Sequence, residues 1–151
     1  MLKVSDAVNL AFHASALLAS AEGPRSVGDL ARRMEMSENH LSKVMQRLGR
    51  AGLVKSRRGP SGGFELARPA QDIRLLDIYE AIEGPYVEQG CLLAKPVCDG
   101  SCCLLGGLLQ SLHAQLRAHL EGTRLSDMCP AFSTSISKEA PHGQAKDHPD
   151  R

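Results

Sequence analysis

Four of the five cysteines lie between Cys91 and Cys103, and this clustering is the strongest chemical signal in the chain. Their thiolates are ligands that suit zinc or an iron–sulfur cluster. Structural zinc sites favour paired Cys-x2-Cys knuckles, which this stretch lacks. An iron–sulfur cluster held in an open loop accepts wider spacing. The stretch therefore favours an iron–sulfur cluster, with a zinc site or a set of free cysteines left open by spacing alone.

The expected compartment also favours metal or redox chemistry at these thiols. No charged region followed by an uninterrupted apolar block opens the sequence, so no secretory signal is visible. No apolar run is long enough to span a membrane. We therefore expect a cytoplasmic protein with no membrane partner. In the cytosol, clustered thiols bind metal or sense redox state more often than they form structural disulfides.

Charge is distributed unevenly along the chain. Residues 1–68 carry eleven Lys/Arg against six Asp/Glu, and residues 69–151 carry seven against eleven, although the net charge of the whole chain is only +1. A basic first half joined to an acidic second half is typical of nucleic-acid binders. The alternative is a chance distribution, so the positions of the basic residues decide.

Those basic residues fall on a predicted helix-turn-helix. One short helix spans about residues 26–33, and a second begins after Ser37 and ends near Gly52. The second helix has an apolar stripe and an opposite polar stripe, which consists of Asn39, Lys43, Gln46, Arg47 and Arg50. Amides and guanidinium groups on one helix face suit base edges in the major groove and flanking phosphates. The alternative is a solvated helix face.

A basic β-hairpin is predicted directly after this helix. Residues 53–58 alternate like a strand, residues 59–63 form a tight turn, and residues 64–66 return. Arg57 and Arg58, at the base of the tip, can reach phosphates or a narrow minor groove. The predicted fold is thus mostly α, a winged helix-turn-helix with a two-stranded β-wing. An ordinary basic hairpin is the alternative.

Helices are also predicted over Ser5–Ala21, over Ile73–Glu83 and, as one long helix, from Cys103 to Leu120. Ser5 and Ser26 are the predicted N-caps of the helices that they precede. Leu105, Leu109, Leu112, Leu116 and His119 form a heptad seam on the long helix. Helix-turn-helix proteins usually read two half-sites, so the seam predicts a C-terminal dimerisation helix and a homodimer. Packing on its own domain is the alternative. His113 and His119 are expected on the seam or the surface.

The chain is predicted to divide into three parts. Residues 1–68 form the winged helix-turn-helix DNA-binding region, and residues 69–132 hold the cysteine loop and the dimerisation helix. Residues 133–151 are polar and lack an apolar period, so they are predicted to be a disordered tail.

Together these elements resemble the Rrf-two (Rrf2) family of bacterial transcription regulators. The resemblance covers Leu2 to Met128 and rests most on residues 58–64, which are similar to the family's wing. It implies a homodimeric DNA-binding regulator, expected to be a repressor and not an enzyme. The residues expected to contact double-stranded DNA are Ser37, Asn39, His40, Lys43, Gln46, Arg47, Arg57, Arg58, Gly62 and Gly63.

In that family, cysteines ligate a 2Fe–2S or 4Fe–4S cluster that senses redox state, nitric oxide or iron–sulfur status. The resemblance assigns these metal-binding roles to Cys91, Cys98 and Cys103. Cys102 is then an extra thiol that could exchange roles with its neighbour. Other members lack a cluster and sense through thiol oxidation or a protein partner, for which Cys102, Cys103 and Cys129 could serve.

The fourth ligand differs among members of the family. Some use a histidine, but Gly106 occupies the matching position here. In nitric-oxide-sensing members it is an aspartate donated by the other subunit, and Asp6 stands at the matching place. The candidates are therefore Asp6 from the other subunit and Cys102. A first-turn acid that stabilises the helix dipole is the alternative role for Asp6.

Overall fold

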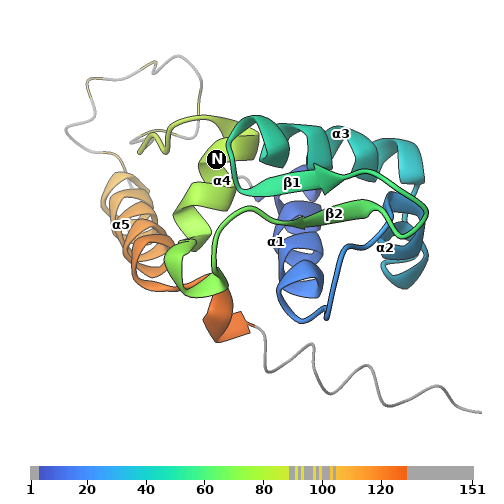
Figure 1. Ribbon diagram of the computed structural model, residues 1–151. Helices are drawn as coiled ribbons and strands as arrows, with labels where there is room; N and C mark the ends of the chain where they lie inside the picture. The colour runs from blue at the N-terminus through green and yellow to red at the C-terminus, as the bar shows by residue number, and fades with distance from the viewer. Residues whose placement is uncertain are drawn as a thin grey trace, which may run out of the picture.

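The computed structural model describes residues 4–88 and 105–128, together with the single positions 91, 93, 97, 99 and 103. The helices are α1 (Asp6–Ala19), α2 (Val27–Arg33), α3 (Glu38–Arg50), α4 (Leu75–Glu83) and α5 (Gly106–Gly122), with a short 3-10 helix η1 (Ala70–Asp72). The strands β1 (Val54–Arg57) and β2 (Gly63–Leu66) form a two-stranded antiparallel sheet. The predicted mostly helical fold with a two-stranded wing is confirmed (Figure 1).

Helix α1 forms the centre of the core because apolar residues cover most of its surface. Val8, Ala11 and Ala14 are fully buried, and α1 packs against α3, α4 and β2. Ser5 caps the helix, as the sequence predicts, by accepting a hydrogen bond from the Val8 N–H at 3.3 Å. Each buried valine or leucine side chain contributes about 1.5–3 kcal/mol, so α1 holds α3, the wing and α4 together.

The wing is a hairpin that a further segment extends. Strands β1 and β2 pair antiparallel, with Val54 opposite Leu66. Arg25 pairs with Phe64 through backbone hydrogen bonds of 2.9 and 2.8 Å. No local pattern predicts this pairing, which joins the wing to the segment before α2.

Gly63 is the point where the wing and that segment approach most closely. Its φ is +151°, and an added Cβ would overlap the backbone of Arg25. Replacing Gly63 by alanine is expected to lower the free energy of unfolding by at least about 2 kcal/mol, because strain and overpacking act together. Urea unfolding followed by circular dichroism measures this loss.

Gly107→Ala is the matched control for this substitution. Nothing lies within 4 Å of the Cβ that would be added at Gly107. Its effect on the free energy of unfolding is expected to stay below about 1 kcal/mol. Equal losses in the two variants would contradict the role given to Gly63.

The start of α4 differs from the sequence prediction and shows how α5 is held. Ile73, where the helix was predicted to begin, is extended, and its carbonyl accepts the Leu125 N–H at 2.9 Å. The Leu75 N–H donates to the Thr123 carbonyl at 3.1 Å. The end of α5 is therefore paired with the start of α4, a non-local contact that periodicity cannot reveal.

Arg74 and Asp77 close the first turn of α4. The Arg74 N–H donates to the Asp77 carboxylate at 2.9 Å, and Arg74 Nη2 donates to it at 2.7 Å. Burial raises the pKa of Asp77, but the hydrogen bonds and charge of Arg74 outweigh burial and lower that pKa below its ordinary value. The carboxylate therefore stays ionised at neutral pH and stabilises the first turn of α4, which is paired with the end of α5.

Candidate nucleic-acid interface and cysteine loop

The polar face of α3 is exposed, as a recognition helix requires. Its opposite face is buried and consists of Leu41, Val44, Met45 and Leu48. The predicted contact residues on this element are all exposed: Ser37, Asn39, His40, Lys43, Gln46 and Arg47. Ser37 makes no side-chain capping bond. Its hydroxyl stands at a helix N-terminus, which favours an anion such as a phosphate.

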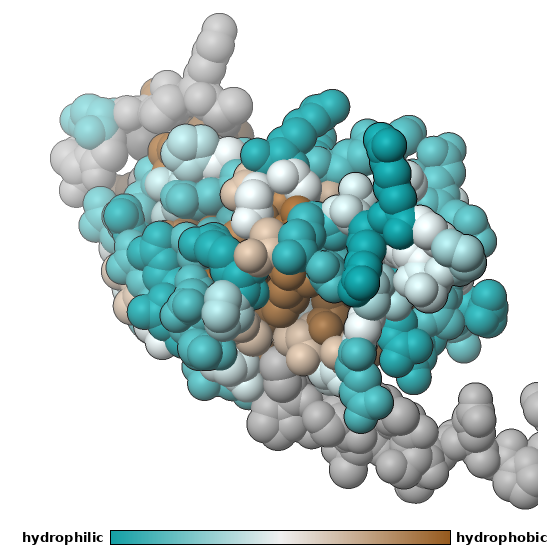
Figure 2. All heavy atoms as spheres, viewed as in Figure 1, coloured by the Kyte–Doolittle hydropathy of each residue, from teal (hydrophilic) through white to brown (hydrophobic). Residues whose placement is uncertain are grey.

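The wing presents the remaining predicted residues. Arg57 and Arg58 are exposed, whereas Gly62 and Gly63 are half-buried. An added Cβ at either glycine would overlap backbone atoms, so these glycines shape the wing whether or not they also approach DNA. Hydrophilic side chains cover most of the molecular face that carries the sheet, and the largest group of apolar ones lies near its middle (Figure 2).

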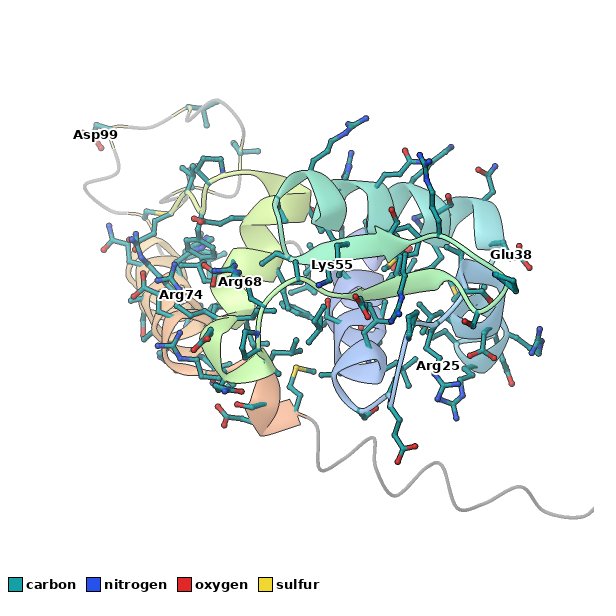
Figure 3. All side chains as sticks on the ribbon, in the orientation of Figure 1. Arg25, Glu38, Lys55, Arg68, Arg74 and Asp99 are labelled. Atoms are coloured by element: carbon teal, nitrogen blue, oxygen red, sulfur yellow. The ribbon has the colours of Figure 1, made fainter. Side chains whose placement is uncertain are left out.

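A groove between α3 and β1 adds basic residues that the predicted contact set omits. It has a volume of about 530 Å³ and is lined by Met45, Gln46, Gly49, Arg50, Val54, Lys55, Ser56 and Phe64. Lys55 lies 3.4 Å from the Glu65 carboxylate and is seen on β1 in Figure 3. The strand alternation that predicted the wing could have identified Lys55, and Arg50 belonged to the polar stripe.

Arg47 lies where α3 meets another helix. Its Nη1 donates a hydrogen bond to the Ile82 carbonyl at 3.2 Å. Ile82 belongs to the last turn of α4. The residue predicted to contact DNA thus directs one of its donors to the helix that leads to the cysteine loop.

The described part of the cysteine loop contains two of the predicted ligands. Cys91 is half-buried, Cys103 is exposed, and both are free thiols. Cys91 Sγ accepts the Leu93 N–H at 3.4 Å. The Cys103 carbonyl accepts the Gly106 N–H at 3.3 Å, so a turn precedes α5 and the helix begins at Gly106 instead of at Cys103.

The other predicted ligands cannot be placed in the same way. Cys98 and Cys102, like Cys129, lie outside the described residues. Among the residues that the structure does describe, no group of at least three His, Cys, Asp or Glu is arranged to hold a metal ion. The ligand set therefore stays a prediction.

Asp6 is exposed in the first turn of α1. The preceding Ser5 hydroxyl donates to the Glu83 carboxylate at the end of α4. The start of α1 therefore lies against this end of α4, from which the chain continues toward the cysteine loop. Asp6 thus lies at the end of the molecule where the candidate cluster ligands begin, and its role as a ligand stays a prediction.

Sequence reasoning missed a tyrosine–histidine contact that closes the base of the cysteine loop. Tyr86 precedes the loop and His113 lies on α5 beyond it. The Tyr86 hydroxyl lies 2.9 Å from His113 Nδ1 and donates to the His113 carbonyl at 3.2 Å. His113 is only 5% exposed and lies between Leu109 and Leu116 on α5, so of the two expected places it takes the seam and not the surface. Its burial follows from the face of α5 that α4 covers.

The electrostatics of this contact keep the tyrosine a donor. Burial raises the pKa of Tyr86, and Tyr79 and Glu88 raise it further, against the opposing effect of Arg117. The tyrosine therefore keeps its proton at neutral pH. Its ring also packs against Tyr79 of α4, with ring centroids 5.4 Å apart. Both arms of the loop are thereby joined at Tyr86.

Replacing Tyr86 by phenylalanine is expected to cost about 1–2 kcal/mol of unfolding free energy, because it leaves polar atoms of His113 unsatisfied. Urea unfolding measures the loss, and amide hydrogen exchange in α5 is expected to accelerate. Tyr79→Phe retains its ring contact and is expected to change both quantities less. Equal effects in the two variants would contradict the importance of the Tyr86 hydroxyl.

The predicted seam on α5 is divided between two faces. Leu109 is buried and Leu116 is half-buried, against α4 and its surroundings. Leu105 and Leu112 of the predicted seam instead face outward, with exposed fractions of 44% and 40%, and so does Leu108, which the predicted seam did not include, at 56%. We call these three residues the outer leucine stripe. Packing on its own domain and an outward apolar face therefore both occur on this helix.

Comparisons with known proteins identify close similarity over most of the chain. The family model described as "Rrf2: Iron-dependent Transcriptional regulator" matches residues 4–131. The curated transcriptional regulator IscR of Cereibacter sphaeroides is 35% identical over 116 residues, covering 70% of this chain and 75% of the relative. Protein rrf2 of Nitratidesulfovibrio vulgaris is 29% identical over 142 residues, 89% of this chain and 91% of the relative.

Solved structures show the same similarity. CymR, the global cysteine regulator of B. subtilis, superposes with a TM-score of 0.72 at 28% identity, covering 87% of this chain and 98% of that one. IscR of T. potens gives a TM-score of 0.66 at 30% identity, covering 95% and 94%. Within the described residues, no helix combines the length and the apolar character needed to cross a membrane.

Proposed function

Because the chain belongs to the Rrf2 family of transcriptional regulators, we propose that it is a homodimeric cytoplasmic repressor whose DNA affinity depends on an iron–sulfur cluster in the cysteine loop. Its relatives are DNA-binding regulators and not enzymes. The observation that carries the proposal is the placement of Cys91 and Cys103. They are free thiols on the two arms of a loop that joins α4, which contacts the recognition helix, to α5.

The described thiols suit such a cluster chemically. Cys91 Sγ already accepts a backbone N–H, and hydrogen bonds to the sulfurs tune clusters of this kind. Cys103 is exposed and lies just before α5, so its sulfur is accessible to a cluster held in the loop. We assign Cys91, Cys98 and Cys103 as ligands, with Asp6 of the other subunit or Cys102 as the fourth. A cluster bound there supplies a centre that reacts with oxidants and nitric oxide.

The residues of α3 and the wing supply the DNA contacts in this proposal. The exposed face of α3 enters the major groove, where Asn39 and Gln46 suit adenine edges and Lys43 suits guanine or phosphate. Arg57 and Arg58 of the wing reach the flanking backbone or the minor groove. Arg50 and Lys55 are added to the set because they line the groove between the two elements.

The second copy of the chain is proposed to cover the outer leucine stripe of α5. These residues are apolar and exposed, and they follow the spacing of a helix–helix seam. A dimer built on α5 places two recognition helices at a distance set by that helix. A change in the cysteine loop then changes their spacing, and DNA affinity shifts by the difference in free energy between the two arrangements.

Similarity to CymR keeps a cluster-free regulator, which senses by thiol oxidation, as the competing function. Anaerobic reconstitution with iron and sulfide, followed by a visible spectrum and metal counts, separates the two. The proposal predicts a coloured protein with iron and sulfide in equal amounts. A colourless protein with zinc or no metal, which still responds to thiol oxidation, would establish the competing function instead.

A further inference from the structure

The C-terminal end of α4 lacks a cation of its own. Helix C-termini carry unpaired carbonyls and a partial negative charge, which a nearby cation stabilises. The last turn of α4 contains no basic residue, and Glu80 and Glu83 lie there instead. Arg47 of α3 supplies the missing cation, because its Nη1 donates to the Ile82 carbonyl at 3.2 Å.

The same end of α4 is hydrogen-bonded to the segment that leads into the cysteine loop. The Glu80 carboxylate accepts the Tyr86 N–H at 3.0 Å, and Glu80 also provides the carbonyl that accepts the Gly84 N–H at 3.0 Å. The Tyr86 hydroxyl reaches His113 on α5, the helix that follows the loop. A shift of Tyr86 before the loop, or of His113 after it, therefore acts on the last turn of α4.

A continuous set of contacts therefore runs from the loop to the recognition helix. It passes from Tyr86 to Glu80, through the backbone of the last turn of α4 to Ile82 two residues on, and from Ile82 to Arg47 of α3. The last turn of α4 is hydrogen-bonded to Tyr86 on one side and to Arg47 on the other. A shift of Tyr86 therefore moves this turn and, with it, the partner of Arg47, if both hydrogen bonds are to be kept.

We propose that Arg47 is a positioning residue that couples the cysteine loop to the recognition helix, and that it does not read DNA itself. Its guanidinium holds α3 to the end of α4, so the position of α3 follows the state of the loop. This inference rests on the proposed function, since it names how loop chemistry reaches the DNA-binding helix. It departs from the sequence prediction, which placed Arg47 among the DNA contacts.

The test titrates one operator duplex with wild-type protein and Arg47→Met, each with and without its cluster, at several salt concentrations. Allosteric coupling typically changes affinity about 5–150-fold. For the wild type, we expect the ratio of the DNA affinities with and without the cluster to lie in that range. In Arg47→Met this affinity ratio is expected to fall to within about twofold of one, because the coupling free energy is lost. Its visible spectrum is expected to stay that of the wild type.

The salt dependence separates positioning from DNA contact. Each lost phosphate contact lowers the slope of log affinity against log salt by about 0.9. Arg47→Met is expected to keep the wild-type slope. Lys43→Met removes one cation from the exposed face of α3 and is the matched control. It is expected to reduce the slope of log affinity against log salt and to keep the ratio of the affinities with and without the cluster. Arg47→Lys retains a donor for the Ile82 carbonyl and is expected to restore part of the ratio.

The opposing results are distinct. A reduced slope with a preserved ratio in Arg47→Met would make Arg47 a DNA contact and overturn the inference while leaving the proposed function standing. A wild-type protein with a cluster but the same affinity in both states would overturn the proposed function, and the inference with it.

Discussion

Replacing Cys103 by serine is expected to abolish the visible absorption of the anaerobically reconstituted protein and, with it, the dependence of DNA affinity on the cluster. Serine is a poor cluster ligand because its hydroxyl stays protonated at neutral pH, whereas iron–sulfur clusters are held by cysteine thiolates. Cys103 is exposed, so the substitution removes no core packing. Circular dichroism is therefore expected to show unchanged helix content.

Cys129→Ser is the matched control, since Cys129 stands apart from the clustered cysteines in the sequence. It is expected to retain the colour and the regulated DNA binding. Cys91→Ser is expected to behave like Cys103→Ser, because a cluster needs both arms of the loop. Retained colour in Cys103→Ser together with loss of colour in Cys102→Ser would reassign the ligand to the neighbouring thiol.

The second large effect is expected at the outer leucine stripe. Leu108 is the most exposed of its residues, at 56%, so a glutamate there leaves the core of one subunit unchanged. In a dimer, the same glutamate would bury an unpaired charge against its copy, which costs far more than the apolar contact it removes. Leu108→Glu is therefore expected to be monomeric by analytical ultracentrifugation.

Loss of the dimer is expected to reduce DNA affinity because the two DNA-binding regions are then no longer linked and bind the two half-sites independently. Two linked binding modules gain about 10²–10⁴ in affinity over one, so Leu108→Glu is expected to bind a two-half-site duplex at least about 100-fold more weakly. Gln110→Glu adds the same charge at another exposed position of α5 and is expected to stay dimeric. A dimeric Leu108→Glu with normal affinity would exclude this face as the interface.

Local sequence signals were sufficient for most of the fold. Ser5 and Ser26 were predicted as helix caps, and both accept the expected backbone hydrogen bonds. The glycine-rich turn and alternating strands predicted the wing. Ile73 was assigned to α4 incorrectly, because its extended conformation depends on pairing with Leu125, a partner distant in sequence.

Residues of the candidate site could be predicted only where the hydrophobic period of a helix decides which side chains are exposed. The amphipathic pattern of α3 identified its exposed face, and the structure bears this exposure out. On α5 the pattern could not distinguish leucines that pack on α4 from those that face outward. The contact of His113 with the Tyr86 hydroxyl could not be predicted either, because the two residues are 27 positions apart in the sequence. The bond from Arg47 to Ile82 likewise joins helices whose packing no local pattern specifies.

The proposed regulator binds the same DNA with different affinities with and without its cluster. Fluorescence anisotropy of an operator duplex, titrated anaerobically with the reconstituted protein and with the same sample after chelation of iron, measures both affinities. We expect them to differ about 5–150-fold and to fall steeply with salt in both states. Equal affinities in the two states, in a sample shown to carry iron and sulfide, would contradict this expectation.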